Sequence, residues 1–214
     1  MAVRLNAVAP EYRGRVRLRT RPFPLEVGDG DAAPRDILEQ EWWLAALQEP
    51  DAAFAPYRGD DWPATTLPAF VAAWCAARQG AAVGQDYDLR IRRAFFAQSR
   101  NIGRPEVLLD LAREGGLDMS RFSHDFAGAE ARAAVLAERQ LGQERYGVGG
   151  TPTPMLADGT VLPAPLTEPR MLERKIVAVG RLPCYGDSCR DATRALFERA
   201  LATAGGAGTT RATR

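Results

Sequence analysis

The sequence predicts an α/β fold in which a small β-sheet is interrupted by a long helical insertion. Three observations lead to this prediction. Residues 15–21 alternate between arginine and either an apolar residue or threonine, the period-two pattern of a strand with one face toward solvent. Residues 153–162 carry the hairpin signal Asp158-Gly159 between two short extended stretches. The chain between these two segments shows helical periodicity almost throughout.

The expected elements can be placed in order along the chain. Pro22 and Pro24 should end the first strand because proline removes ladder donors, and a loop is expected at residues 28–33. Helices are predicted at residues 36–48, 67–78, 86–100, 105–113 and 130–141, and a short turn or helix at residues 118–125. Thr66 is expected to cap the second of these helices. After the hairpin, helices are predicted at residues 168–179 and 190–202, followed by a disordered tail at residues 204–214.

The composition is that of an ordinary soluble globular protein, with 46% hydrophobic and 26% charged residues among 214. A net charge of +1 argues against a dedicated nucleic-acid surface. No apolar run approaches the roughly 20 residues that a membrane span needs, and the first residues lack the apolar region of a secretory signal. We therefore expect a cytoplasmic protein without membrane or nucleic-acid partners. Nothing in the sequence indicates its oligomeric state.

A glycine- and proline-rich loop at residues 147–154 precedes the predicted hairpin, with Val148-Gly149-Gly150-Thr151-Pro152-Thr153 at its centre. Glycine-rich loops can bind phosphate, but that use requires a following helix whose N-terminus faces the anion. Here two prolines and a hairpin follow, so phosphate binding is disfavoured. Two readings stay open on the residues alone: a shaped turn, or a loop that delivers the chain into the edge of a sheet.

This loop resembles the one before the third strand in thioredoxin-fold proteins of the DsbA family, which carry a Val-x-Gly-Thr/Val-Pro-Thr pattern. Phe23-Pro24-Leu25, after an alternating strand, is also similar to the family's second strand, which precedes a helical insertion. The resemblance covers roughly residues 15–202. It is strongest to the cytoplasmic branch that includes polyketide-pathway oxidoreductases.

The resemblance implies a thioredoxin-like part formed by residues 1–32 and 144–203, with a helical insertion at residues 33–143. It further implies a cis Thr151-Pro152 peptide, beside which an extended substrate segment pairs with the backbone. The implied activity is thiol–disulfide oxidoreduction on protein or small-molecule thiols and disulfides, with no cofactor.

The sequence departs from the family at its beginning. Redox members carry Cys-x-x-Cys at the N-terminus of the first helix, and these 214 residues contain no such motif. Residues 5–12 could form the end of that helix, but no candidate exists for the opening strand. We therefore expect an N-terminally incomplete fold, either because Met1 is not the natural start or because the chain is a degraded or partner-completed member of the family. No catalytic residue can be assigned, and little or no turnover is expected.

Two alternatives to the oxidoreductase hypothesis remain. The first is an enzyme of the kappa-class glutathione transferase or 2-hydroxychromene-2-carboxylate isomerase type, which belongs to the same superfamily and needs only a single serine or cysteine. The second is a non-catalytic module that binds a peptide or partner.

The three cysteines have different expected roles. Cys184 and Cys189 are five positions apart, and a loop containing Gly186 could bring them within disulfide distance as an accessory or regulatory dithiol. Alternatively, both are reduced cysteines at the entrance of the last helix, since cytosolic disulfides are rare. Cys75 lies in an apolar helical run and is expected to be buried and inert. A zinc site would need all three cysteines and His124, so no metal site is predicted.

The remaining polar and aromatic candidates favour structural roles. His124 is expected to be partly buried. The arginines of residues 15–21 are expected to form a solvated strand face, although they could attract an acidic thiol such as glutathione. A set of aromatic residues could line a substrate groove, but a core or interface role is favoured: Trp42, Trp43, Tyr57 and Trp62.

Overall fold

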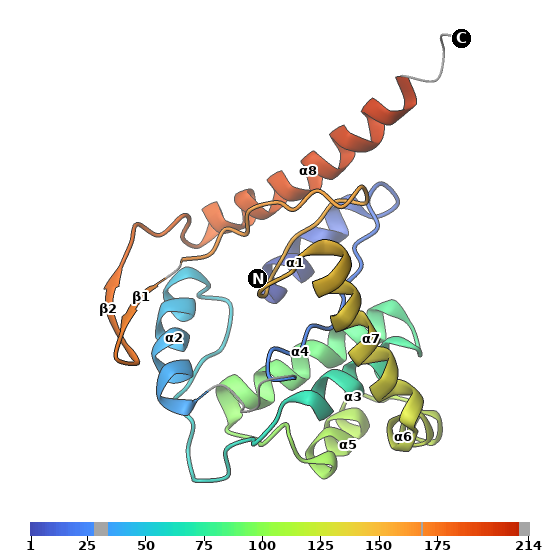
Figure 1. Ribbon diagram of the computed structural model, residues 1–214. Helices are drawn as coiled ribbons and strands as arrows, with labels where there is room; N and C mark the ends of the chain where they lie inside the picture. Colours follow the sequence, from blue (N-terminus) through green and yellow to red (C-terminus); the bar gives the residue numbers. More distant parts are fainter. Residues whose placement is uncertain (28–33, 168, 210–214) are drawn as a thin grey trace.

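The computed structural model describes residues 1–27, 34–167 and 169–209 of the chain. The loop predicted at residues 28–33 and the last five residues of the predicted tail lie outside the described residues. The elements run in the order α1 (Ala2–Val8), η1 (Ala9–Tyr12), α2 (Arg35–Gln48), α3 (Leu67–Ala77), α4 (Ala81–Gln98), α5 (Pro105–Glu114), α6 (Met119–Ala127), α7 (Ala129–Tyr146), β1 (Pro169–Leu172), β2 (Lys175–Val179) and α8 (Asp187–Thr209) (Figure 1).

Helices α3 to α7 form a bundle around the main apolar core, in the lower half of Figure 1. Its fully buried members include Leu108, Phe122 and Val135, which come from three different helices. Tyr87 is also buried there, and its hydroxyl donates a hydrogen bond to the carbonyl oxygen of Leu108 at 2.7 Å. The bond satisfies the one polar group that this ring carries into the core.

Helices α3 and α4 cross closely because Gly84 presents no side chain at the contact. A Cβ atom built on Gly84 would lie 2.6 Å from the Cα of Ala77, closer than packed atoms approach. The small residue therefore lets the two helix backbones come together, which brings their apolar faces into one core.

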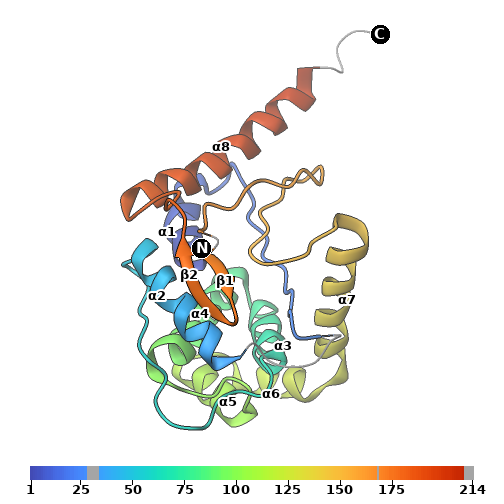
Figure 2. The same ribbon diagram turned by 60° about the vertical axis from the view of Figure 1, so that its left-hand side comes forward.

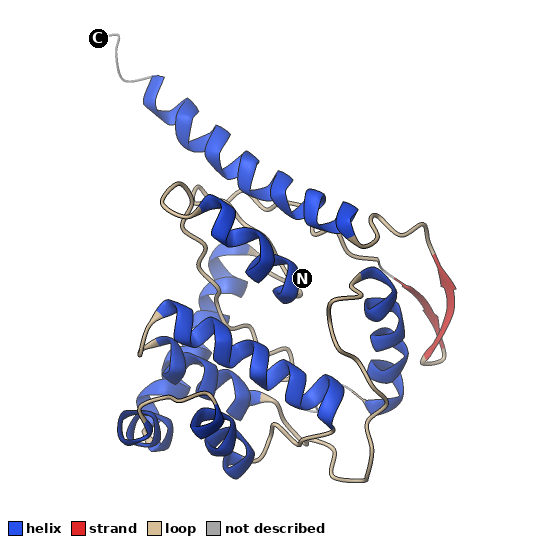
Figure 3. Cartoon of the chain, turned by 180° about the vertical axis from the view of Figure 1, so that it is seen from behind, coloured by secondary structure: helices blue, strands red, loops and turns tan. Residues whose placement is uncertain are grey.

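A second layer consists of α1 and η1 packed against α8, above the bundle (Figure 3). The rings of Tyr12 and Phe197 stack with centroids 4.7 Å apart, and Val8 is fully buried beside them. Polar contacts frame this small core: the Tyr12 hydroxyl donates to Glu198 at 2.7 Å, and Arg194 forms two 2.8 Å hydrogen bonds to Glu11.

The strand predicted at residues 15–21 is absent from the structure. Arg15 lies in a turn, residues 16–21 have no regular secondary structure, and within the described residues no strand pairs with them. Its apolar residues behave as predicted, since Val16 and Leu18 pack on the small core of α1 and α8. The arginines of the other face are partly paired rather than simply solvated: Arg19 and Arg21 both contact Glu138 on α7. A strand needs a partner's backbone groups, and alternation alone does not supply them.

The helix predicted at residues 168–179 is wrong, because β1 and β2 form an antiparallel hairpin there. Glu173 and Arg174 both adopt positive φ angles of 46° and 66°, the geometry of a tight two-residue turn. Tertiary contacts with α2 hold the hairpin in place: Gln40 accepts a hydrogen bond from the Ile176 amide at 2.9 Å, and Arg174 pairs with Asp36. The β-branched residues of β2 suit this conformation and outweigh the helical pattern.

Two further details differ from expectation. Thr66 does not cap α3 with its side chain, because its hydroxyl bonds the carboxylate of Glu26 at 2.8 Å instead. Helix α8 continues to Thr209, whereas the sequence pattern placed its end near Ala202 and a disordered tail after it. The hairpin predicted at Asp158-Gly159 is present in a minimal form: Met155 and Val161 form a single antiparallel bridge, and Gly159 has a φ of 92°.

Candidate functional site

The loop at residues 147–154 begins where α7 ends. Gly147 takes a left-handed conformation with a φ of 63°, and its amide bonds the Gln143 carbonyl at 3.1 Å. This is the usual way for a helix to stop, since glycine adopts positive φ without a Cβ clash. The chain then turns through Gly149 and Gly150 to a cis peptide between Thr151 and Pro152, which confirms the conformation that the resemblance implied.

The same loop presents backbone groups to solvent. Gly149 and Thr151 are exposed, and within the described residues the amides of Gly149, Gly150 and Thr151 have no hydrogen-bond acceptor. The hydroxyl of Thr153 donates to the Gly150 carbonyl at 2.7 Å, which closes the loop on its inner side. Free, exposed amides in a braced loop can pair with an extended segment that binds beside them.

The loop lies near the N-terminal end of α1, as the views in Figures 1 and 2 agree. From there the chain runs through the hairpin at Asp158-Gly159 and returns along α8 to Pro165. Pro165 lies beside the second feature of the site, a disulfide at the start of α8.

Cys184 and Cys189 are joined by a disulfide of 2.06 Å, with Cα atoms 4.9 Å apart. Cys184 lies in the loop before α8 and Cys189 in the first turn of that helix. Both residues are buried, with exposed fractions of 7% and 0%. Of the two readings left open by the sequence, the structure contains the bonded pair.

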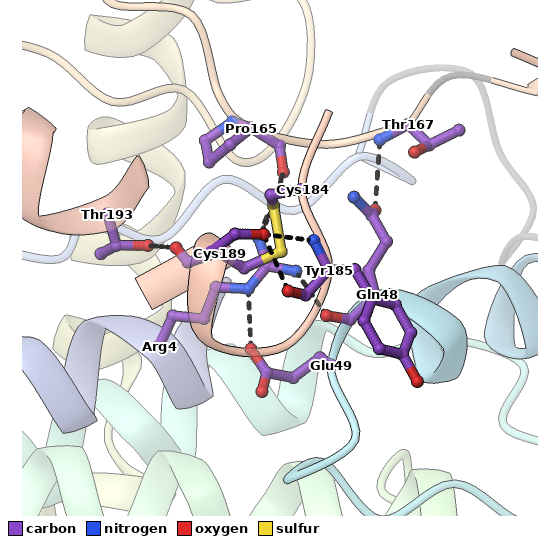
Figure 4. The surroundings of a disulfide bond; sticks show 10 residues. Arg4, Gln48, Glu49, Pro165, Thr167, Cys184, Tyr185, Cys189 and Thr193 are labelled. Carbon is purple, nitrogen blue, oxygen red and sulfur yellow. Dashed lines mark hydrogen bonds and ion pairs between the residues drawn. A yellow bond between two sulfur atoms is a disulfide. The ribbon is translucent and has the colours of Figure 1, made fainter. Parts of the chain in front are cut away.

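A buried arginine stands beside the disulfide (Figure 4). Arg4, from α1, is only 2% exposed, and its Nε donates to the Glu49 carboxylate at 2.7 Å. Its Nη1 lies 3.1 Å from the Pro165 carbonyl oxygen and 3.7 Å from Sγ of Cys184. Three segments far apart in sequence therefore meet at one guanidinium, and we call this set the arginine–disulfide junction: Arg4, Glu49, Pro165, Cys184 and Cys189.

The junction could not be found from the sequence. Arg4 is one of many arginines in the chain, and Glu49 directly follows a helix without belonging to a motif. The weak signal is that Arg4 is the one charged residue of a short, mostly apolar first helix, where a charge buried by tertiary contacts must find a partner.

Cys75 is fully buried in the bundle core, as predicted. Burial raises the pKa of its thiol to about 12, and the nearby carboxylate of Asp125 acts in the same direction. A thiol held neutral in this way is a poor nucleophile, so Cys75 contributes packing and no redox chemistry.

The aromatic candidates join the core, as favoured, with one exception. Trp42 and Tyr57 are buried, and the Trp62 ring lies between them at centroid distances of 5.9 and 4.9 Å. Trp43 is 65% exposed on the other face of α2. His124 is exposed on α6, so the expectation that it would be partly buried is wrong.

Neither a metal centre nor a membrane span is found in the part of the chain that the structure describes. No three residues among its histidines, cysteines, aspartates and glutamates lie together in a way that could hold a metal ion. No helix there is both long and apolar enough to cross a bilayer.

Comparison with known proteins gives the fold and the family. Over 92% of its length the chain is similar to the cytosolic disulfide reductase DsbM from Pseudomonas aeruginosa, with 23% identity, 91% of that chain covered and a TM-score of 0.60. A second structure of DsbM, with GSH, matches at a TM-score of 0.57 and 23% identity, covering 92% of each chain. A proposed protein disulfide isomerase from Nitrosomonas europaea matches at 0.59 and 17% identity, covering 92% of this chain and 90% of that one.

These structural likenesses show the fold: a thioredoxin-like α/β fold with a large helical part. A family model described as Thioredoxin matches residues 53–161, half of the chain, from the helical bundle through the cis-proline loop and its hairpin. The chain therefore belongs to this thioredoxin family and is a DsbA-like thioredoxin-fold protein.

Proposed function

We propose that this protein binds an extended thiol or disulfide substrate along the cis-proline loop, in the manner of DsbA-like oxidoreductases. The observation that carries the proposal is a row of amides at Gly149, Gly150 and Thr151 that have no acceptor among the described residues, on a loop closed by Thr153 in which Gly149 and Thr151 are exposed. A bound segment would pair with these amides as an added strand.

Glutathione is the small substrate that we propose as a first probe. One DsbM structure of the same fold is described as being with GSH, which supports this choice. Glutathione is short and extended, with peptide carbonyls that can accept hydrogen bonds from loop amides. Because DsbM is described as cytosolic, we also place the activity of this protein in the cytoplasm as part of the proposal.

We propose further that the polypeptide of these 214 residues catalyses little or no turnover. Thiol–disulfide exchange by this family starts with attack by an accessible thiolate. The sequence has no Cys-x-x-Cys, Cys75 is buried with a raised pKa, and Cys184 and Cys189 are bonded to each other. Reduction of insulin disulfides should therefore stay near the uncatalysed rate, and robust turnover by this chain would overturn this part of the proposal.

The second candidate function is a binding module without catalysis. It is favoured because the chain has the cis-proline loop but no accessible thiolate. Substrate binding without turnover is common to both readings. They differ in whether a disulfide-containing ligand is preferred over its reduced form. Titration calorimetry with oxidised and reduced glutathione separates them, because an oxidoreductase-like site should discriminate between the two and a general module should not.

The loop assignment is tested by a bulky substitution. Thr151→Tyr would cover the exposed amides, and we expect it to weaken binding of oxidised glutathione by about tenfold or more, the loss of one or two hydrogen bonds. Ala157→Tyr is the matched control, since Ala157 is exposed at the tip of the adjacent hairpin. Equal weakening by both variants, or by neither, would place the binding site elsewhere.

A further inference from the structure

We propose that the Cys184–Cys189 disulfide is itself a thiol–disulfide exchange site, separate from the cis-proline loop and reducible by small monothiols of the glutathione class, and that Arg4 stabilises its reduced form. The proposal does not rest on the cis-proline loop, and it would hold even if that loop bound nothing. It rests on the composition of the arginine–disulfide junction.

The surroundings of Cys184 favour a thiolate over a neutral sulfur. Nη1 of Arg4 lies 3.7 Å from its Sγ, inside a site where water does not compete for the guanidinium. Arg4 has one carboxylate partner, and its Nη1, which donates to the Pro165 carbonyl, also lies against the sulfur of Cys184. A disulfide sulfur is only a weak acceptor for such a donor. The same guanidinium makes a much stronger interaction with a thiolate.

The surroundings of Cys189 act in the same direction. Cys189 lies in the first turn of the long helix α8, which begins at Asp187. The amide of Cys189 is already bonded to the Gly186 carbonyl, but the positive end of the helix dipole lies at this position and favours a negative sulfur. Factors that stabilise the reduced form of a dithiol make its disulfide easier to reduce.

Access to the pair is through the preceding loop. Residues 180–186 are exposed or half-exposed at every position except Cys184 itself, and Tyr185 is 61% exposed. A segment with so little buried surface can open locally without unfolding of the bundle. The disulfide is therefore buried in the structure, but local opening of one short loop would expose it to solvent.

The exchange reaction balances with two monothiols. The thiolate of the first attacks Sγ of Cys189, the Cys184–Cys189 bond breaks, and the electron pair leaves on Cys184 as a thiolate beside Arg4. The thiolate of the second monothiol then attacks the sulfur of the first in the mixed disulfide. Cys189 is released as a thiolate, and the two monothiols leave as one oxidised disulfide. Two electrons pass from the monothiols to the cysteine pair.

The equilibrium can be measured by mass spectrometry. The oxidised protein is equilibrated without oxygen in buffers of increasing ratio of reduced to oxidised glutathione, quenched with acid, and alkylated. Trypsin cleaves after Arg181 and Arg190, so one peptide holds both Cys184 and Cys189 while Cys75 falls in another. We expect a complete transition of this peptide within the accessible glutathione range.

Two charge-neutralising substitutions then distinguish the proposed role from a structural one. Arg4→Gln keeps a hydrogen-bond donor but removes the charge, and should make the pair harder to reduce, raising the midpoint ratio by about tenfold. Glu49→Gln keeps an acceptor but removes the charge that competes for Arg4, and should lower the midpoint. A structural role would move both variants in one direction through shared destabilisation.

Each outcome of this experiment either supports or overturns the proposed exchange site. Opposite shifts of the two midpoints support the exchange site. If Arg4→Gln does not fold, a lowered midpoint in Glu49→Gln still supports the proposal, and an unchanged or raised one overturns it. Failure of the wild-type pair to become reduced at any glutathione ratio, with circular dichroism showing a folded protein, also overturns it.

Discussion

The helical bundle and the arginine–disulfide junction are held together by different kinds of interaction. The bundle core is formed mainly by apolar side chains of α3 to α7, and the hydroxyls of its buried Tyr57 and Tyr87 each donate a hydrogen bond to a carbonyl oxygen. The junction instead brings an ion pair, a carbonyl and a disulfide together from distant parts of the chain. In the bundle many small contributions add up. In the junction, loss of either Arg4 or Glu49 leaves the other as an unpaired buried charge.

The largest effect is expected at the junction. Arg4→Met removes the partner of Glu49, which is 7% exposed, and should lower the free energy of unfolding by about 3–5 kcal/mol. The double variant Arg4→Met/Glu49→Met should recover most of this loss, because no charge is then buried alone. Chemical denaturation of the single and double variants makes the comparison. A double variant as unstable as the single one would mean that packing rather than charge holds the junction.

In the bundle we expect a similar or smaller loss of stability, and no second substitution should restore it. Leu108→Ala leaves a cavity at a fully buried site and should cost about 2–5 kcal/mol. Val177→Ala, on the exposed side of β2, should change stability by less than about 0.5 kcal/mol. If the two substitutions cost the same, the apolar core assigned to α3–α7 is incorrect.

The last prediction concerns how the stability of the bundle depends on pH through the thiol of Cys75, which lies in the bundle core and not in the junction. The raised pKa of Cys75 means that the unfolded chain loses this proton first, near the ordinary value of 9.0, while the folded protein keeps it until about 12. The contribution is therefore fully present below pH 9 and is lost as the pH rises above it. We expect wild-type stability to fall by about 1 kcal/mol more than that of Cys75→Ala between pH 8 and 10. Parallel pH curves would contradict the neutral, buried thiol.

The same contrast explains what the sequence could predict. The helices of the bundle follow from apolar periodicity and from prolines and glycines near their ends, which are local properties, and the boundaries of α3 and α5 come within one residue of prediction. The hairpin at Asp158-Gly159 and the turn at Gly147 are local as well. The cis Thr151-Pro152 peptide came from family resemblance rather than from any physical pattern.

The failures of prediction share one cause, which is dependence on residues distant in sequence. Residues 15–21 have the alternation of a strand but pack on α7 and α8 without a paired neighbour. The hairpin of β1 and β2 depends on Gln40 and Asp36 from α2, so residues 168–179 read alone look helical. The role of Arg4 can be recognised only once the fold brings Glu49 and Cys184 beside it.

The most direct test of the account is a nuclear magnetic resonance titration of the ¹⁵N-labelled protein with oxidised glutathione. We predict that amide shifts concentrate at Gly149, Gly150 and Thr151, whose N–H groups have no acceptor in the described part of the chain, and that no glutathione is reduced during the titration. Shifts confined to other parts of the chain, or an unperturbed loop at saturating ligand, would contradict the assignment of this loop as the substrate-binding site.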